Sequence, residues 1–289
     1  MKTNDWIKKQ YEFQSQHEAE YKLPTAYWMP EGVDAWLHRR KLFQVLPLIQ
    51  NSPDSKWLTI GDGRFGADAY FLNKMGVHAV ASSISDATLK VALERGYIQE
   101  YKVENAERMT SSDGEFDYVL CKESYHHFPR PPLAFYEMLR VASKAVILIE
   151  PIEGPNRLLD WLRNSVVKKL VRGDQSALFE PSGNFIYRVS IREIEKMMNA
   201  INGSIIAVRF FNTFYHPKLA SQINGFTIGS LLTKLAISIQ DLLCHLRLMN
   251  YGLATIIAFK TPATPEIQQA LRDSGYHLIY LPQNPYLSD

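Results

Sequence analysis

Apolar and polar positions follow two different periods in the first half of the chain. Short apolar runs of strand length occur at 57–61, 77–83, 116–121 and 144–150, with a weaker one inside 96–106. The segments between them carry apolar residues at helical spacing, as in PPLAFYEMLRVAS before the last run. Strands and helices that alternate in this way predict βαβ units and a parallel sheet with helices on both faces.

Outside this region the pattern is more helical. Two β-rich runs at 203–215 and 252–260 are expected to complete the sheet, and Ser190 with Glu193 forms a capping-box pattern that opens a helix. The parts expected are an N-terminal helical lid or extension (1–50), an α/β core (51–151), a helical substrate-side insertion (152–189), the rest of the sheet with a helical insertion at 216–250 (190–262), and a C-terminal tail with an irregular end (263–289).

Composition places the chain among ordinary globular proteins. Hydrophobic residues make up 46% and charged residues 21% of its 289 residues. The net charge of +2 gives no reason to expect a nucleic-acid partner. The N-terminus lacks an apolar signal-peptide region, and the longest apolar segment (228–246) is interrupted by Lys234, Gln240 and Asp241. The sequence therefore predicts no transmembrane segment and a cytoplasmic location.

A glycine-rich loop joins the first predicted strand to the helix that follows it. Gly61, Gly63 and Gly66 stand in LTIGDGRFGADA, where glycine lets a ligand approach the backbone and the helix N-terminus offers unpaired N–H groups. The alternative is a tight turn that binds nothing. A dinucleotide would require an acid about 20 residues further on, and Ser83 occupies that position.

The segments that follow resemble a known family. An NAE loop, a GEFDYVL strand, an HHF turn, an EMLRV helix and an apolar strand ending in EP appear in order between 103 and 151. With the glycine loop, they resemble a class I S-adenosylmethionine-dependent methyltransferase of the small-molecule type, over about 35–151 and more loosely in the two later strands. The resemblance implies an α/β fold whose seven-stranded, mostly parallel sheet has an antiparallel last strand, and S-adenosylmethionine as cofactor.

The resemblance also assigns residues to the cofactor. The glycines would contact its methionine part and ribose, Asn105, Ala106 and Glu107 would border the adenine, and Lys122 and Glu123 would lie near the reactive methyl group. Two positions depart from the family pattern, because Thr59 and Ser83 stand where acids are usual. The residues expected at the cofactor are Gly61, Asp62, Gly63, Gly66, Ser82, Ser83, Asn105, Ala106, Glu107, Lys122 and Glu123; no metal site is expected.

Two adjacent histidines are the candidates for a catalytic base. His126 and His127 follow the fourth predicted strand, at the carboxyl edge where ligands bind in open α/β sheets. An unperturbed imidazole titrates near ~6.5, which suits proton removal from an acceptor. The alternative is that one of the two packs beneath the helix at 131–142 and only the other faces the cleft.

The expected function is methyl transfer from S-adenosylmethionine to an oxygen or nitrogen of a small molecule, such as a sugar or another cell-envelope or natural-product intermediate. One alternative is a non-catalytic protein of the same fold that binds a nucleoside or a protein partner, favoured by Thr59 and Ser83. Another is a dinucleotide-dependent oxidoreductase. The amphipathic segment 228–248 leaves open core packing, a homodimer contact or contact with a lipid-linked acceptor.

Overall fold

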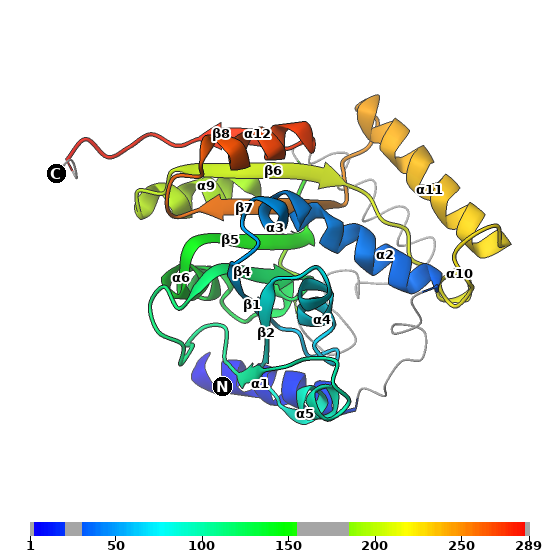
Figure 1. Ribbon diagram of the computed structural model, residues 1–289, viewed down its shortest axis with the longest axis horizontal. Helices are drawn as coiled ribbons and strands as arrows, with labels where there is room; N and C mark the ends of the chain where they lie inside the picture. The colour runs from blue at the N-terminus through cyan, green and yellow to red at the C-terminus, as the bar shows by residue number, and fades with distance from the viewer. Residues whose placement is uncertain (1–2, 21–30, 155–184, 287–289) are drawn as a thin grey trace.

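The computed structural model describes residues 3–20, 31–154 and 185–286, which form an α/β fold around one eight-stranded sheet (Figure 1). The strand order is β3-β2-β1-β4-β5-β7-β6-β8. The strands are β1 (Lys56–Ile60), β2 (His78–Ser83), β3 (Tyr101–Val103), β4 (Phe116–Lys122), β5 (Ala142–Pro151), β6 (Ile205–Phe211), β7 (Leu253–Phe259) and β8 (His277–Tyr280). The first five pair in parallel, and β7 is antiparallel to both of its neighbours.

This arrangement confirms the predicted α/β fold with a mostly parallel sheet and an antiparallel last strand of the core. Strands β1, β4, β5 and β7 are buried along most of their length, so their sequences read as continuous apolar runs. The eighth strand was not predicted. It is a four-residue edge strand that is only partly buried, too short to show a clear alternation of apolar and polar positions.

Helices cover both faces of the sheet. They are α1 (Thr3–Ala19), α2 (Val33–Leu42), α3 (Leu46–Asn51), α4 (Ala67–Lys74), α5 (Ala87–Glu94), α6 (Pro131–Val141), α9 (Ile191–Ala200), α10 (Pro217–Ala220), α11 (Ile228–His245) and α12 (Pro265–Asp273), with 3₁₀ turns η1 (Phe43–Val45) and η2 (Tyr125–His127). Side chains of α3, α4, α5 and α12 share one apolar cluster with the sheet, and those of α6 and α9 share the other.

The outer parts agree with the sequence in some places. Ser190 Oγ accepts a hydrogen bond from the Glu193 N–H at 3.2 Å, which confirms the predicted helix cap at the start of α9. Most of the predicted insertion at 152–189 lies outside the described residues. The predicted insertion at 216–250 contains α10 and α11, and α12 and β8 lie in the expected C-terminal tail.

Helix α11 projects from the body of the molecule at the upper right of Figure 1. It buries Ile237 and Cys244 but leaves Leu231, Leu235 and Leu242 about half exposed. Neither a homodimer contact nor a lipid-linked acceptor is tested by this exposure, and both stay predictions. In the described part of the chain, no helix combines the length and apolar character needed to cross a bilayer.

The glycine loop connects β1 to α4 through left-handed backbone. Gly61 has φ +72° and Gly66 has φ +63°, a region that is unfavourable for residues with a Cβ. A Cβ at Gly66 would also lie 2.7 Å from Ile98 Cγ2. Gly66 thus allows the chain to turn into α4 while Ile98 packs directly against it.

We therefore expect Gly66→Ala to destabilise the fold more than Gly76→Ala. Both residues have positive φ, but a Cβ at Gly76 meets no atom within 4 Å. Gly76→Ala should lower the free energy of unfolding by about 1 kcal/mol from backbone strain alone. Gly66→Ala should lower it by about 2 kcal/mol or more, because Ile98 must also shift. Urea denaturation of both variants measures the difference, and equal losses would contradict this account.

Candidate functional site

Two adjoining cavities lie where the parallel strands end. The larger, of about 420 Å³, is bordered by the loops that follow β1, β4 and β5. The smaller, of about 60 Å³, lies beside the ends of β2 and β3. The residues that border both cavities are Gln14, Glu18, Gly61, Ser124 and His127. Because they share these walls, the two cavities are neighbouring parts of one cleft.

The structure gathers most of the site residues expected from the sequence around this cleft. The larger cavity is lined by Gly61, Asp62, Gly63, Lys122, Glu123, His126 and His127. The smaller cavity is lined by Ser83, Asn105, Ala106 and Glu107. Gly66 and Ser82 border neither of the two. Gly66 lies at the start of α4, and Ser82 Oγ donates to the Thr59 carbonyl oxygen at 2.7 Å.

Asp62 links the glycine loop to strand β1 and to helix α4 through hydrogen bonds. Its carboxylate accepts from Thr59 Oγ1 at 2.9 Å and from the backbone N–H groups of Asp68 and Ala69 at 3.2 and 2.9 Å. These N–H groups belong to the first turn of α4, where the helix has no internal acceptor for them. Burial and the neighbouring Asp68 carboxylate raise the pKa of Asp62. Thr59 therefore supports an acid in the loop instead of supplying one from the strand.

Charged side chains from three elements, α2, α4 and the end of β4, meet at the larger cavity. Lys122 Nζ lies 3.1 Å from Asp68 Oδ1, and Lys41 Nζ lies 2.6 Å from Glu123 Oε2. Partial burial alone would raise the pKa of Glu123, but the two ammonium groups outweigh it and hold the pKa well below its usual range. Burial, with help from the same lysines, lowers the pKa of His38 well below its usual value.

A buried carboxylate organises the turn that carries the two histidines. Glu150, at the end of β5, is fully buried and accepts from the N–H groups of Ser124 and Tyr125 at 2.8 and 2.9 Å. Its other oxygen lies 2.6 Å from His126 Nδ1. Because a carboxylate only accepts, Nδ1 carries the proton, and Nε2 is the acceptor when the ring is neutral. The His127 ring centroid lies 4.0 Å from that of His126.

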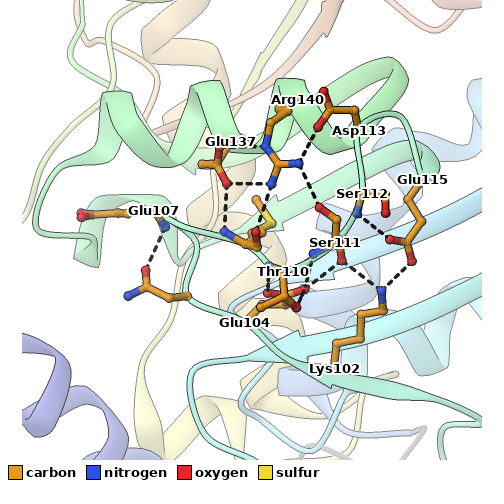
Figure 2. A network of polar contacts seen from close by, with 12 residues as sticks. Lys102, Glu104, Glu107, Thr110, Ser111, Ser112, Asp113, Glu115, Glu137 and Arg140 are labelled. Atoms are coloured by element: carbon orange, nitrogen blue, oxygen red, sulfur yellow. Dashed lines mark hydrogen bonds and ion pairs between the residues drawn. The ribbon is translucent and has the colours of Figure 1, made fainter.

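The loop after β3 has its own polar network, shown in Figure 2. The Glu104 carboxylate accepts from the N–H groups of Thr110 and Ser111 at 2.7 and 3.1 Å and from both hydroxyls. Arg140, on α6, bridges Glu137 and Asp113 at 2.9 and 2.7 Å. These bonds fix the path of the chain that forms one wall of the smaller cavity.

The N-terminal helices contribute residues that the sequence did not single out. Gln14 and Glu18 on α1, and Asp34, His38 and Lys41 on α2, all border the larger cavity. The three on α2 are spaced i, i+4 and i+7, which places them on one face of the helix. A row of polar residues on one face of a helix that was expected to pack against the domain is the signal from which the sequence could have placed these residues at the site.

The aromatic residues of the N-terminal segment, which was expected to form a lid or extension, are only partly described. Tyr11 borders the smaller cavity, and its hydroxyl donates to Glu107 Oε2 at 2.5 Å. Tyr21, Tyr27 and Trp28 lie outside the described residues. Tyr215, which follows β6, also lines the larger cavity.

Comparison with known proteins agrees with this fold. A family profile described as "Methyltransferase domain" matches residues 58–149, which run from β1 to β5. A search against curated proteins found no match. A proposed methyltransferase from Bacillus halodurans C-125 is 20% identical with a TM-score of 0.52, over 77% of this chain and 99% of that one. The YcgJ protein from Bacillus subtilis is 18% identical with a TM-score of 0.53, over 78% and 100%.

The domain match confirms the prediction of a class I methyltransferase domain, of the enzyme class that uses S-adenosylmethionine. The two structural neighbours independently show that the fold is of this type.

The charge cluster at Glu123 should make stability fall in acid. A carboxylate with a depressed pKa stabilises the fold at pH values above the pKa that the group has in the unfolded chain, here 4.5. This contribution is lost as the pH falls below 4.5. From pH 6 to pH 3, wild type should lose about 2 kcal/mol more stability than Glu123→Gln, since each unit below 4.5 is worth about 1.4 kcal/mol. Denaturant titrations at several pH values measure this. Glu12→Gln, an exposed change, should follow wild type; parallel wild-type and Glu123→Gln curves would refute the assignment.

Proposed function

We propose that this chain transfers a methyl group from S-adenosylmethionine to an oxygen or nitrogen of a small polar molecule. The observation that carries the proposal is the pair of adjoining cavities that meet at the glycine loop. In this proposal the smaller cavity takes the adenine, the larger cavity takes the methionine part and the acceptor, and Gly61 lies at the point where they join.

The residues present suit such a cofactor. A Cβ at Gly61 would lie 2.5 Å from Ser124 Cβ, and a Cβ at Gly63 would lie 2.5 Å from Glu18 Cδ, so side chains at these positions would fill the cleft. Ile60, Ile84 and Phe128 give the smaller cavity apolar walls suited to a purine ring. When bound, the cofactor supplies a methyl group already activated on a sulfonium.

His126 is the base in this proposal, and Glu150 is the residue that orients it. With its proton on Nδ1 held by Glu150, the neutral ring offers Nε2 as acceptor for the proton of the incoming hydroxyl or amine. His126 borders only the larger cavity, whereas His127 borders both cavities. His127 is the second candidate for the same role.

The larger cavity favours a polar acceptor. Its lining includes both signs of charge, from Asp34, Arg64, Lys122 and Glu123 among others. An apolar molecule would remove water from these charged groups and offer them no hydrogen bonds in return. A sugar or another hydroxylated or amino intermediate could offer them hydrogen bonds. A non-catalytic, nucleoside-binding role is the second candidate, supported by Thr59 and Ser83 in place of acids.

Calorimetric titration with S-adenosylhomocysteine tests the cofactor site first. Wild type should bind with micromolar affinity, and Gly63→Arg should weaken binding at least ~100-fold, because the new side chain enters the cleft. Gln269→Arg, an exposed change on α12, is the matched control and should bind as wild type does. Absence of binding to wild type at millimolar ligand would overturn the proposed function.

A methyl-transfer screen with hydroxylated and amino compounds then tests the base. For any acceptor found, His126→Gln should lower kcat by ~100-fold or more, while the affinity for S-adenosylhomocysteine stays within a few-fold of wild type. Glu150→Gln should lower kcat and shift the limb of the pH–rate profile that reports the histidine. Full activity in His126→Gln, with loss in His127→Gln, would assign the base to His127 instead. Binding without any transfer would favour the non-catalytic role.

A further inference from the structure

A carboxylate from another element of the fold lies at the end of strand β2. Ser83 ends the strand, and its Oγ donates to Glu18 Oε2 at 2.7 Å. Glu18 lies in the last turn of α1, 65 residues away, and is only 4% exposed. A distant helix therefore places an acid against the serine at the carboxyl edge of the sheet.

This carboxylate lies at the junction of the two cavities. Glu18 borders both of them, together with Gln14 one turn earlier on α1. The position of a Cβ on Gly63 would be 2.5 Å from Glu18 Cδ and 2.7 and 2.8 Å from its two oxygens. The acid is thus in contact with the glycine loop on one side and with the end of β2 on the other.

Helix stability does not explain an acid at this place. A carboxylate near the C-terminus of a helix meets the negative end of the helix dipole, which is unfavourable. A buried carboxylate is also costly unless hydrogen bonds compensate it. Ser83 and Gln14, whose Nε2 lies 3.4 Å from Glu18 Oε1, provide part of that compensation.

We infer that Glu18 binds the two ribose hydroxyls of the cofactor, so that α1 is part of the cofactor site; this inference rests on the proposed function. A nucleoside that spans both cavities must pass its ribose through their junction, where Glu18 lies. The vicinal hydroxyls are two donors, and one carboxylate can accept from both through charge-assisted hydrogen bonds. Without Glu18, Ser83 would offer the ribose only a neutral hydroxyl.

The same face of α1 is fastened at the adenine end of the cleft. Tyr11, Gln14 and Glu18 are spaced i, i+3 and i+7, so they lie along one face of the helix. Tyr11 donates to Glu107 Oε2 at 2.5 Å, and Arg130 Nη2 lies 2.6 Å from the same oxygen. These contacts hold α1 in register with the cleft and set where Glu18 reaches it.

The test measures how much each ribose hydroxyl contributes in the presence and absence of the Glu18 charge. The probes are S-adenosylhomocysteine, adenosine and 2′,3′-dideoxyadenosine, titrated into wild type, Glu18→Gln and Glu12→Gln, which changes an exposed acid on the same helix. Wild type and Glu12→Gln should bind adenosine at least ~10-fold more tightly than the dideoxy probe. In Glu18→Gln, affinity for the two hydroxyl-bearing ligands should fall ~10- to 100-fold, and the preference for adenosine should nearly vanish.

The ratio of the two nucleoside affinities is the decisive readout, because both probes bind only the folded fraction of a variant. The inference is overturned if Glu18→Gln binds S-adenosylhomocysteine as wild type does. It is also overturned if the variant weakens adenosine and dideoxyadenosine equally, which would mean that Glu18 only supports the fold. Wild type that binds none of the three ligands would instead overturn the proposed function, a result distinct from either of these.

Discussion

The site depends on the fully buried carboxylate of Glu150. It lies at the end of β5 and accepts from two consecutive backbone N–H groups of the turn after β4, while also holding the ring of His126. A buried acid without these partners would be strongly unfavourable, so the turn has little freedom to take another path. Ser124 in that turn contacts Gly61, so the same carboxylate indirectly sets the width of the cleft beside the glycine loop.

The core of the fold was predictable because its signals are local. Strands buried on both faces give apolar runs, and the glycines before α4 are required by the left-handed backbone at Gly61 and Gly66. The cap at Ser190 depends on residues three apart in sequence and was predicted for the same reason. By contrast, β8 is short and half exposed, and its pairing with β6 depends on partners far away in sequence.

The site was predictable only where its residues belong to those local signals. The glycine loop and the turn with the histidines follow strands, and parallel strands bring their carboxyl ends to one edge. The contact between Glu18 and Ser83 has no such signal, because nothing in the spacing of α1 shows which surface the helix covers. Similarly, nothing in the sequence shows that the oxygens of Asp62 accept hydrogen bonds from Thr59 and the first turn of α4. A contact between Asp62 and the cofactor stays a prediction.

The wall formed by α1 also has a thermodynamic consequence. Helices in proteins owe most of their stability to packing, so α1 depends on its contacts with the rest of the chain. Any molecule held between α1 and the sheet stabilises the helix, and the free energy needed to order α1 is subtracted from that molecule's affinity. Occupancy of the smaller cavity and the folding of α1 are therefore one linked equilibrium, so that a bound ligand should protect the amides of this helix from exchange.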